Sequence, residues 1–305
     1  MNKRTSGLAL HMAVTVLIAL APHVGRCQAR ANVWYFGNHA GLDFSCAPPV
    51  PITSGMADLE GCAAICDDGG GLAMYTDGDT VWNAAHEVLE NGTGLAAHCA
   101  AFGNVSSSQS AVIVPWPGTA ALYYIFTTDC NEDGNVDGLR YSVVDMSMDG
   151  GQGAVTLKNQ LLFAPACEKV AAVSASDGIG TWVVGHEVGN NTFRAYRVDA
   201  AGLNTTAVVS SSGLLPTSSG QSTRGYLKFS PDGERLLNIS TGLATELFSF
   251  DPVAGTITGV LAFTTSDGNY YGGSFSPNGQ VVYLNGSNFE GGTGLDQYDL
   301  DAGTT

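Results

Sequence analysis

The stretch Phe229-Ser230-Pro231-Asp232-Gly233 recurs downstream as Phe275-Ser276-Pro277-Asn278-Gly279. In each copy the proline fixes one φ angle and the glycine accepts a positive one, so two strands can reverse direction within a few residues. An apolar run follows each copy, at 235–237 and 280–283. The pattern predicts a repeated antiparallel β unit.

Short β-type runs punctuated by glycine turns continue through the rest of the chain. They lie at 111–114, 122–127, 181–184, 193–198, 226–229, 246–250 and 280–284. No segment keeps an apolar period of 3.6 residues for three turns, which disfavours a helical or α/β fold. The sequence therefore predicts an all-β protein.

Looser copies of the turn occur at 67–69, 117–118 and 177–178. They divide the chain into five units, at about 32–95, 105–160, 165–215, 222–262 and 268–305. Repeats of this length are typical of four-stranded propeller blades, whose two apolar faces must be covered by neighbouring blades. We predict a β-propeller of four-stranded antiparallel blades, with about five blades visible of a truncated six- or seven-bladed ring. The alternative is a two-sheet sandwich.

The charge balance limits the possible partners. The 305 residues include 28 Asp plus Glu but only 12 Lys plus Arg, a formal charge of -16. No broad basic face can then form to neutralise phosphates or to lie on an anionic bilayer. We expect neither nucleic-acid binding nor peripheral membrane binding.

Residues 1–29 read as a signal peptide, and 30–305 as a single domain. A basic head, Lys3-Arg4, precedes an apolar stretch at 8–21, which is too short to span a bilayer. We predict cleavage after Ala29 and no membrane insertion afterwards; a lipid anchor on Cys27 is the alternative. The product is expected to be secreted or held at the outer cell surface.

Six cysteines remain after this cleavage: Cys46, Cys62, Cys66, Cys99, Cys130 and Cys167. In an oxidising compartment they could form up to three disulfides, and the sequence does not determine the pairing. A zinc site is the alternative, but no C-x-x-C pair is present and the histidines are scattered.

An acidic loop at 129–138 has the spacing of a calcium site. Oxygen-bearing side chains occupy alternate positions, with a glycine at the sixth: Asp129, Asn131, Asp133, Asn135 and Asp137. Ca²⁺ takes six to eight hard oxygen ligands, and such side chains can converge on one point. The twelfth position is Arg140 instead of the glutamate of an EF-hand, so the loop is more similar to the short calcium loops embedded in propellers. We predict structural Ca²⁺; the alternative is a solvated acidic turn.

Several blocks of sequence resemble a known family. They include Trp34-Tyr35-Phe36-Gly37, Glu60-Gly61-Cys62, Tyr75-Thr76-Asp77-Gly78, Ser107-Ser108-Gln109-Ser110, Gly138-Leu139-Arg140-Tyr141-Ser142 and Glu168-Lys169. In this order they resemble the N-terminal propeller region of large Bacteroidetes surface proteins, which often end in a gliding-motility-associated or type IX secretion sorting domain. The resemblance, over about 31–301, implies a secreted or cell-surface repeat protein. It carries over no catalytic residue.

No catalytic motif stands out. The run 174–182 departs by one residue from the Asp-box of sialidase propellers, and His186-Glu187 lacks the second histidine of a zinc protease. We expect at least three of Trp34, Trp82, Trp116 and Trp182 to pack in the core instead of binding sugar. The sequence favours a non-catalytic extracellular module for binding, display or adhesion, with an extracellular protein or a glycan as partner. The alternative is a secreted polysaccharide hydrolase or lyase acting at the central mouth of the propeller.

Overall fold

The computed structural model describes residues 29–101, 103–263, 270–288 and 292–302. Nearly all regular structure there is antiparallel β-sheet, and helical structure is limited to short turns such as η1 (Asn131–Asp133) and η2 (Asp149–Gly151). The prediction of an all-β protein is confirmed. The predicted signal peptide, apart from Ala29, lies outside the described residues. No helix in the described ranges is long and apolar enough to cross a membrane.

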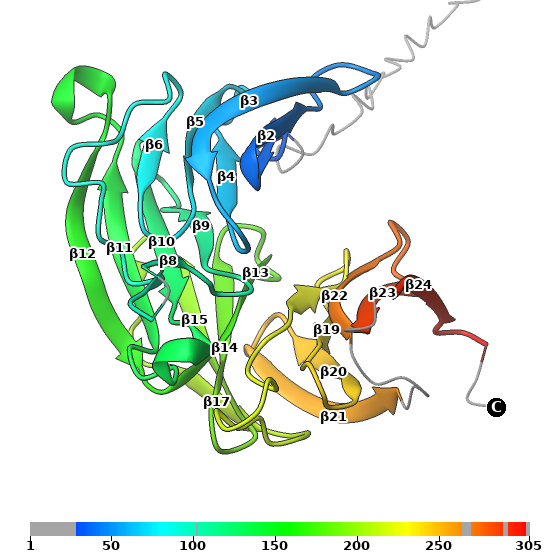
Figure 1. Ribbon diagram of the computed structural model, residues 1–305. Helices are drawn as coiled ribbons and strands as arrows, with labels where there is room; N and C mark the ends of the chain where they lie inside the picture. The colour runs from blue at the N-terminus through cyan, green and yellow to red at the C-terminus, as the bar shows by residue number, and fades with distance from the viewer. Residues whose placement is uncertain (1–28, 102, 264–269, 289–291, 303–305) are drawn as a thin grey trace, which may run out of the picture.

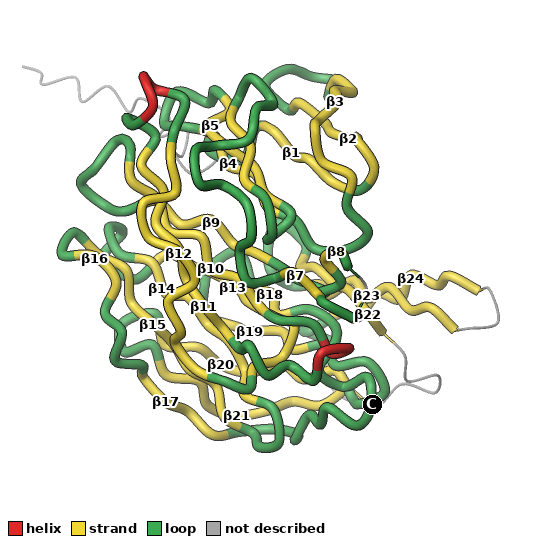
Figure 2. Tube along the Cα trace, turned by 60° about the vertical axis from the view of Figure 1, so that its left-hand side comes forward, coloured by secondary structure: helices red, strands yellow, loops and turns green. Residues whose placement is uncertain are grey.

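Six sheets of three to five strands follow one another along the described chain (Figures 1 and 2). The first two comprise β1 (Val33–Phe36), β2 (Asn38–Asp43) and β3 (Val50–Ala57), then β4 (Ala63–Cys66), β5 (Leu72–Thr76) and β6 (Val81–Asn83). The short pair β7 (His98–Cys99) and β8 (Asn104–Val105) precedes the third, with β9 (Ala111–Pro115), β10 (Leu122–Thr128), β11 (Leu139–Asp145) and β12 (Ala154–Phe163).

The fourth sheet comprises β13 (Ala166–Ser174), β14 (Thr181–Glu187), β15 (Thr192–Asp199), β16 (Gly202–Leu203) and β17 (Val208–Ser211). The fifth comprises β18 (Leu227–Phe229), β19 (Arg235–Asn238), β20 (Thr245–Asp251) and β21 (Thr256–Phe263). The sixth comprises β22 (Tyr270–Phe275), β23 (Val281–Asn288) and β24 (Gly292–Asp299).

The first strands of these sheets contact one another in succession. β1 contacts β4, β4 contacts β9, β9 contacts β13, β13 contacts β18, and β18 contacts β22. Figure 1 shows the sheets as an arc that starts at β2 and β3, passes β12 on the left and ends at β24. Successive sheets joined through their first strands are the arrangement of propeller blades.

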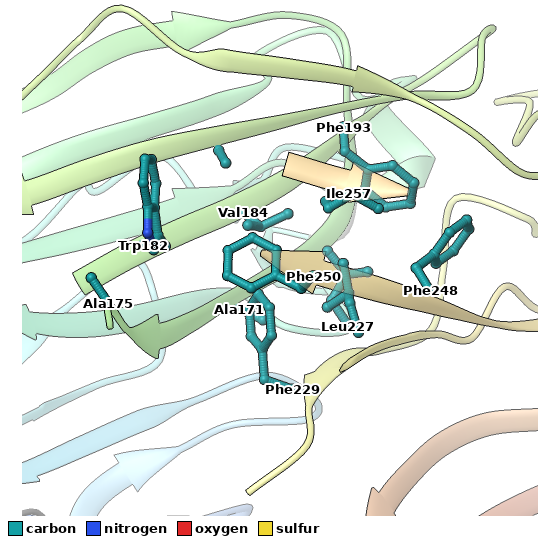
Figure 3. Close-up of a cluster of buried hydrophobic side chains, with 12 residues drawn as sticks. Ala171, Ala175, Trp182, Val184, Phe193, Leu227, Phe229, Phe248, Phe250 and Ile257 are labelled. Carbon is teal, nitrogen blue, oxygen red and sulfur yellow. The ribbon is translucent and has the colours of Figure 1, made fainter. Parts of the chain in front are cut away.

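Five separate apolar cores lie between consecutive sheets. β10 shows why: Tyr123 and Ile125 face the core shared with the second sheet, whereas Tyr124 and Phe126 face the core shared with the fourth. Figure 3 shows the core between the fourth and fifth sheets. Because a fully buried large apolar side chain contributes about 1.5–3 kcal/mol, both faces of each inner sheet stabilise the stack. The two-sheet sandwich is therefore wrong.

The repeated turn forms as predicted. Gly233 and Gly279 have φ angles of 74° and 72°. In both copies the serine accepts a backbone N–H from the following strand through its Oγ, from Arg235 at 2.9 Å and from Val281 at 3.0 Å. The same local chemistry thus reverses the chain at corresponding places in the fifth and sixth sheets.

Two details of the predicted blades are wrong. The expected first unit, 32–95, contains two sheets, so the described chain has six sheets where the sequence predicted about five. The first, second and sixth have three described strands instead of four, and the fourth has five. The boundary was missed because the turn between β1 and β2, at Gly37, carries no copy of the repeated turn that marks the other units. Within the described ranges, no strand of the first sheet pairs with the sixth, so strand pairing does not close the arc.

Candidate functional site

The acidic loop 129–138 connects β10 to β11 as a hairpin, with Thr128 opposite Leu139. Gly134 and Asn135 both have positive φ angles, 81° and 60°. These two residues turn the loop back on itself. The loop then contacts several neighbouring segments, and its predicted ligands take different directions.

Asp129 is fully buried and holds the two ends of the loop together. Its carboxylate accepts the backbone N–H of Cys130 at 2.7 Å through Oδ1 and that of Asp137 at 2.8 Å through Oδ2. Burial raises the pKa of Asp129, although these hydrogen bonds oppose the rise. Both of its oxygens are thus used in stabilising the loop.

The other predicted ligands have partners of their own. Asp133 accepts the backbone N–H groups of Ala100 and Ala101 at 2.6 and 3.0 Å. Asn131 accepts the hydroxyl of Thr223 at 2.8 Å. The exposed Asp137 pairs with Arg140 at 2.9 Å.

Asn135 differs from these residues, because its side chain is buried and neither polar atom has a hydrogen-bond partner in the described structure. The five side chains do not converge on one point as arranged. We looked among the described residues for three Cys, His, Asp or Glu side chains whose ligand atoms lie within 4.8 Å of one another. The one such group is Cys99, Cys130 and Asp133. The two sulfurs of that group form a disulfide. Calcium binding therefore stays a prediction, which calorimetric titration of the metal-free protein tests.

The disulfide Cys99–Cys130 ties β7 to the beginning of the acidic loop. Cys46, Cys62, Cys66 and Cys167 are free thiols. Sequence reasoning left the pairing open, because the two bonded cysteines become neighbours only when the loop folds over β7. The disulfide and the bonds of Asp133 hold the same two segments together.

A groove of about 680 Å³ lies beside this junction. Its lining joins the loop to the segments around β7 and to β12: Asp79, Gly94, Leu95, Ala96, His98, Ala100, Asp133, Asp137, Arg140 and Asn159. The lining is acidic, because it contains three carboxylates and one guanidinium: Asp79, Asp133, Asp137 and Arg140. His98 Nδ1 lies 3.8 Å from Asp79 Oδ1.

The polar side chains of the groove are held by the protein itself. Arg140 donates to the backbone oxygens of Asp137 and Asn159 at 2.9 and 3.2 Å, and Asn159 donates to the oxygen of Gly94 at 2.8 Å. Asp133 is fixed by the two N–H groups described above. A lining fixed before a ligand arrives loses little conformational entropy on binding.

A second polar cluster lies near the starts of β9, β13 and β18, the first strands of the third, fourth and fifth sheets. Glu168 is fully buried and accepts the N–H and hydroxyl of Ser108 at 3.0 and 2.7 Å, and the N–H of Asn131 at 2.5 Å. Burial raises its pKa to about 7. Arg224 pairs with Glu132 of the loop and lies 4.0 Å from Glu168. The cluster joins β13 to the acidic loop and to the segments that precede β9 and β18.

Sequence reasoning identified only part of these sites. Asp133 and Asp137 belong to the groove, but Asp79, His98 and Asn159 carried no motif. Glu168 belonged to the family resemblance, whereas Arg224 gave no signal. Asp79 could have been found by its position, because it is a charged residue that directly follows the turn Tyr75-Thr76-Asp77-Gly78.

The tryptophan prediction is confirmed. Trp82, Trp116 and Trp182 belong to or pack against the cores between sheets. Trp34 is the exception, with 53% of its surface exposed. None of the four lines the groove.

No protein-family model matches the chain, and no curated protein matches it. Among solved structures it is similar to two proteins described as candidate 6-phosphogluconolactonases. One is from Bacteroides fragilis (13% identity, TM-score 0.45, 88% of this chain and 80% of the other), and one is from Bacteroides uniformis (13%, 0.45, 87% and 76%). A functionally unknown protein from Desulfotomaculum acetoxidans is similar at 12% identity and a TM-score of 0.43, over 88% of this chain and 86% of the other.

Proposed function

We propose that the protein is a non-catalytic extracellular module that binds glycan in the groove beside loop 129–138, for adhesion or display at a bacterial surface. The observation that carries this proposal is a groove of about 680 Å³ whose polar side chains are already held in place. Its volume falls within the range of about 300–1,000 Å³ that is usual for ligand sites.

The lining favours a particular glycan chemistry. Carboxylates and a guanidinium form strong hydrogen bonds with sugar hydroxyls. Three carboxylates against one guanidinium repel uronic acids and sulfated sugars, so the ligand is a neutral glycan or an amino sugar. Support for an extracellular location comes from the signal-peptide pattern and the disulfide, since disulfides persist in oxidising compartments. The family resemblance supports a cell-surface role.

We also propose that the six sheets are blades of a six- or seven-bladed ring. The outer face of the first sheet supports this, because Trp34 and Phe36 alternate with buried residues and are 53% and 41% exposed. In a propeller, neighbouring blades cover both faces of each blade. The exposed apolar face of the first sheet is therefore a face that another blade would cover in a ring. Small-angle scattering tests the idea: a flat particle with the curvature of a six- or seven-bladed ring, closed or short of one blade, is expected, and an elongated or two-layered particle contradicts it.

A glycan array followed by a reducing-end assay tests the binding function. Binding without release of new reducing ends is expected, and multiple turnover would support the polysaccharide hydrolase or lyase instead. Asp79→Asn is expected to weaken glycan binding about ten-fold, since a hydrogen bond to a charged group contributes roughly 1.5–3 kcal/mol. Glu234→Gln, on an exposed turn outside the groove, removes the same charge and should leave affinity unchanged. Equal affinity of both variants and the wild type would rule out the groove.

A further inference from the structure

Three polar side chains meet in the interior between the fourth and fifth sheets. Lys169 on β13 is fully buried, and Asn238 on β19 and Glu246 on β20 are each 2% exposed. They lie between the same two sheets as the apolar core of Figure 3. None of them lines the groove.

Their contacts form a chain from amine to amide to carboxyl group. Lys169 Nζ lies 2.9 Å from Asn238 Oδ1. Asn238 Nδ2 in turn donates to Glu246 Oε2 at 3.1 Å. Since a C=O bond is about 1.2 Å long, Nζ lies within about 4 Å of the side-chain carbonyl carbon Cγ. Reacting atoms placed about 3–3.5 Å apart are close to attack, so a small shift suffices.

The buried surroundings favour the reactive forms of Lys169 and Glu246, the two ends of this chain of contacts. Burial lowers the pKa of Lys169, which favours the neutral amine, and an uncharged, desolvated lysine amine is a nucleophile. Burial also raises the pKa of Glu246, which favours the protonated carboxyl group. Ile239 O and Ser240 Oγ accept from Nζ at 3.0 and 2.7 Å and fix its position.

We propose that Lys169 and Asn238 form an intramolecular amide cross-link between the fourth and fifth sheets, with Glu246 as the acid–base group. A bond forms between Nζ and Cγ, and the bond between Cγ and Nδ2 breaks. Glu246 gives its proton to the departing Nδ2 and regains one from Nζ, so ammonia leaves and Glu246 ends as it began. The step needs no oxidant, reductant or co-reactant.

The chain contains a matched internal control. Lys158 Nζ lies 2.8 Å from Asn91 Oδ1, the same kind of contact as the 2.9 Å contact of Lys169 with Asn238. That contact is exposed to solvent, and the Asn91 amide donates to the backbone oxygen of Val155 instead of to a carboxyl group. The Asn91 amide nitrogen therefore has no carboxyl group as its hydrogen-bond partner to protonate it as it leaves. Lys158 and Asn91 should remain unlinked.

Mass spectrometry of the reduced, folded protein tests the cross-link. The expected mass is lower than the sequence mass, counted from the mature N-terminus, by one ammonia molecule. A protease digest should contain a branched peptide joining Lys169 to Asn238, and linear peptides carrying Lys158 and Asn91. Full mass with separate linear peptides for Lys169 and Asn238 overturns the proposal, and shows that Lys169 is only held by its three acceptors.

Glu246→Gln separates the chemistry from the contact. The variant keeps the size of the side chain but has no proton to pass on, so the branched peptide should be lost while circular dichroism still shows a β-sheet protein. A branched peptide at wild-type yield in this variant overturns the role of Glu246. The cross-link does not depend on the proposed glycan binding, and the mass measurement needs no ligand.

Discussion

Glycines in the acidic loop illustrate how one residue limits what the chain can form. Gly138 has a φ of 71°, and a Cβ there would lie 2.2 Å from the backbone oxygen of Phe163. Gly134 has a similar φ of 81°, but a Cβ there would lie 3.7 Å from its nearest neighbour, Val136. Both positions favour glycine, and only Gly138 also lies against backbone that cannot move aside.

Replacing the two glycines separates these effects. Gly134→Ala should lower the free energy of unfolding by about 1–2 kcal/mol, the cost of a left-handed conformation for an L-residue. Gly138→Ala should lower it by more than about 3 kcal/mol, since it adds a steric clash to the same strain. Urea unfolding of the two variants measures the difference. Equal losses would show that the backbone at Phe163 yields easily.

The buried carboxyl group of Glu168 predicts a pH effect. Its pKa rises from 4.5 to about 7 on folding, so the folded protein binds this proton more tightly than the unfolded chain. The resulting stabilisation is present below pH 4.5 and is lost as the pH rises to about 7. Glu168→Gln should remove that dependence. The stability of the wild type relative to the variant should therefore fall by roughly 3 kcal/mol between pH 4.5 and 7.

Thermal unfolding of both proteins across this range measures the effect. Glu132→Gln is a suitable control, since Glu132 is a partly exposed carboxyl group in the same cluster. Parallel stability curves for wild type and Glu168→Gln would show that the hydrogen bonds from Ser108 and Asn131 keep Glu168 ionised.

At the scale of elements, the disulfide joins two segments that have little regular structure to hold them. β7 has two residues, and the acidic loop contains only the short turn η1. The cysteines are 31 residues apart in the chain, and closing a loop of that length contributes about 3–4 kcal/mol by restricting the unfolded chain. The disulfide also positions Asp133 and Ala100 at the groove.

Cys99→Ser combined with Cys130→Ser is therefore expected to lower the free energy of unfolding by about 3 kcal/mol and to weaken glycan binding. Urea unfolding measures the first effect, and titration with the bound glycan measures the second. A reductant should reproduce both changes in the wild type and neither in the variant. Unchanged stability in the double variant would show that the hydrogen bonds of Asp133, and not the disulfide, hold β7 against the acidic loop.

At the scale of the whole molecule, the acidic surplus opposes folding. With 28 acidic against 12 basic residues, compaction brings like charges together. Salt shortens the range of this repulsion, from about 30 Å at 0.01 M to about 8 Å at 0.15 M. The melting temperature should therefore rise by a few degrees over this range, equally in sodium and potassium chloride. A fall in melting temperature would show that attractive pairs such as Arg224–Glu132 dominate instead.

The β-structure and its turns could be predicted from the sequence, because these features depend on neighbours along the chain. The φ preferences of Pro231 and Gly233 act within a few residues, and the alternation in β10 assigns side chains to two opposite faces. These local features imply stacked sheets.

Which distant residues meet depends on how the sheets pack, and local sequence patterns could not predict it. The pairing of Cys99 with Cys130, the groove between Asp79 and Asp137, and the contact of Lys169 with Asn238 all join segments that carry no shared local pattern. The same reason explains the missed boundary at 58–62, where a new sheet begins because the first strands of neighbouring sheets pack together, a contact that no local pattern marks.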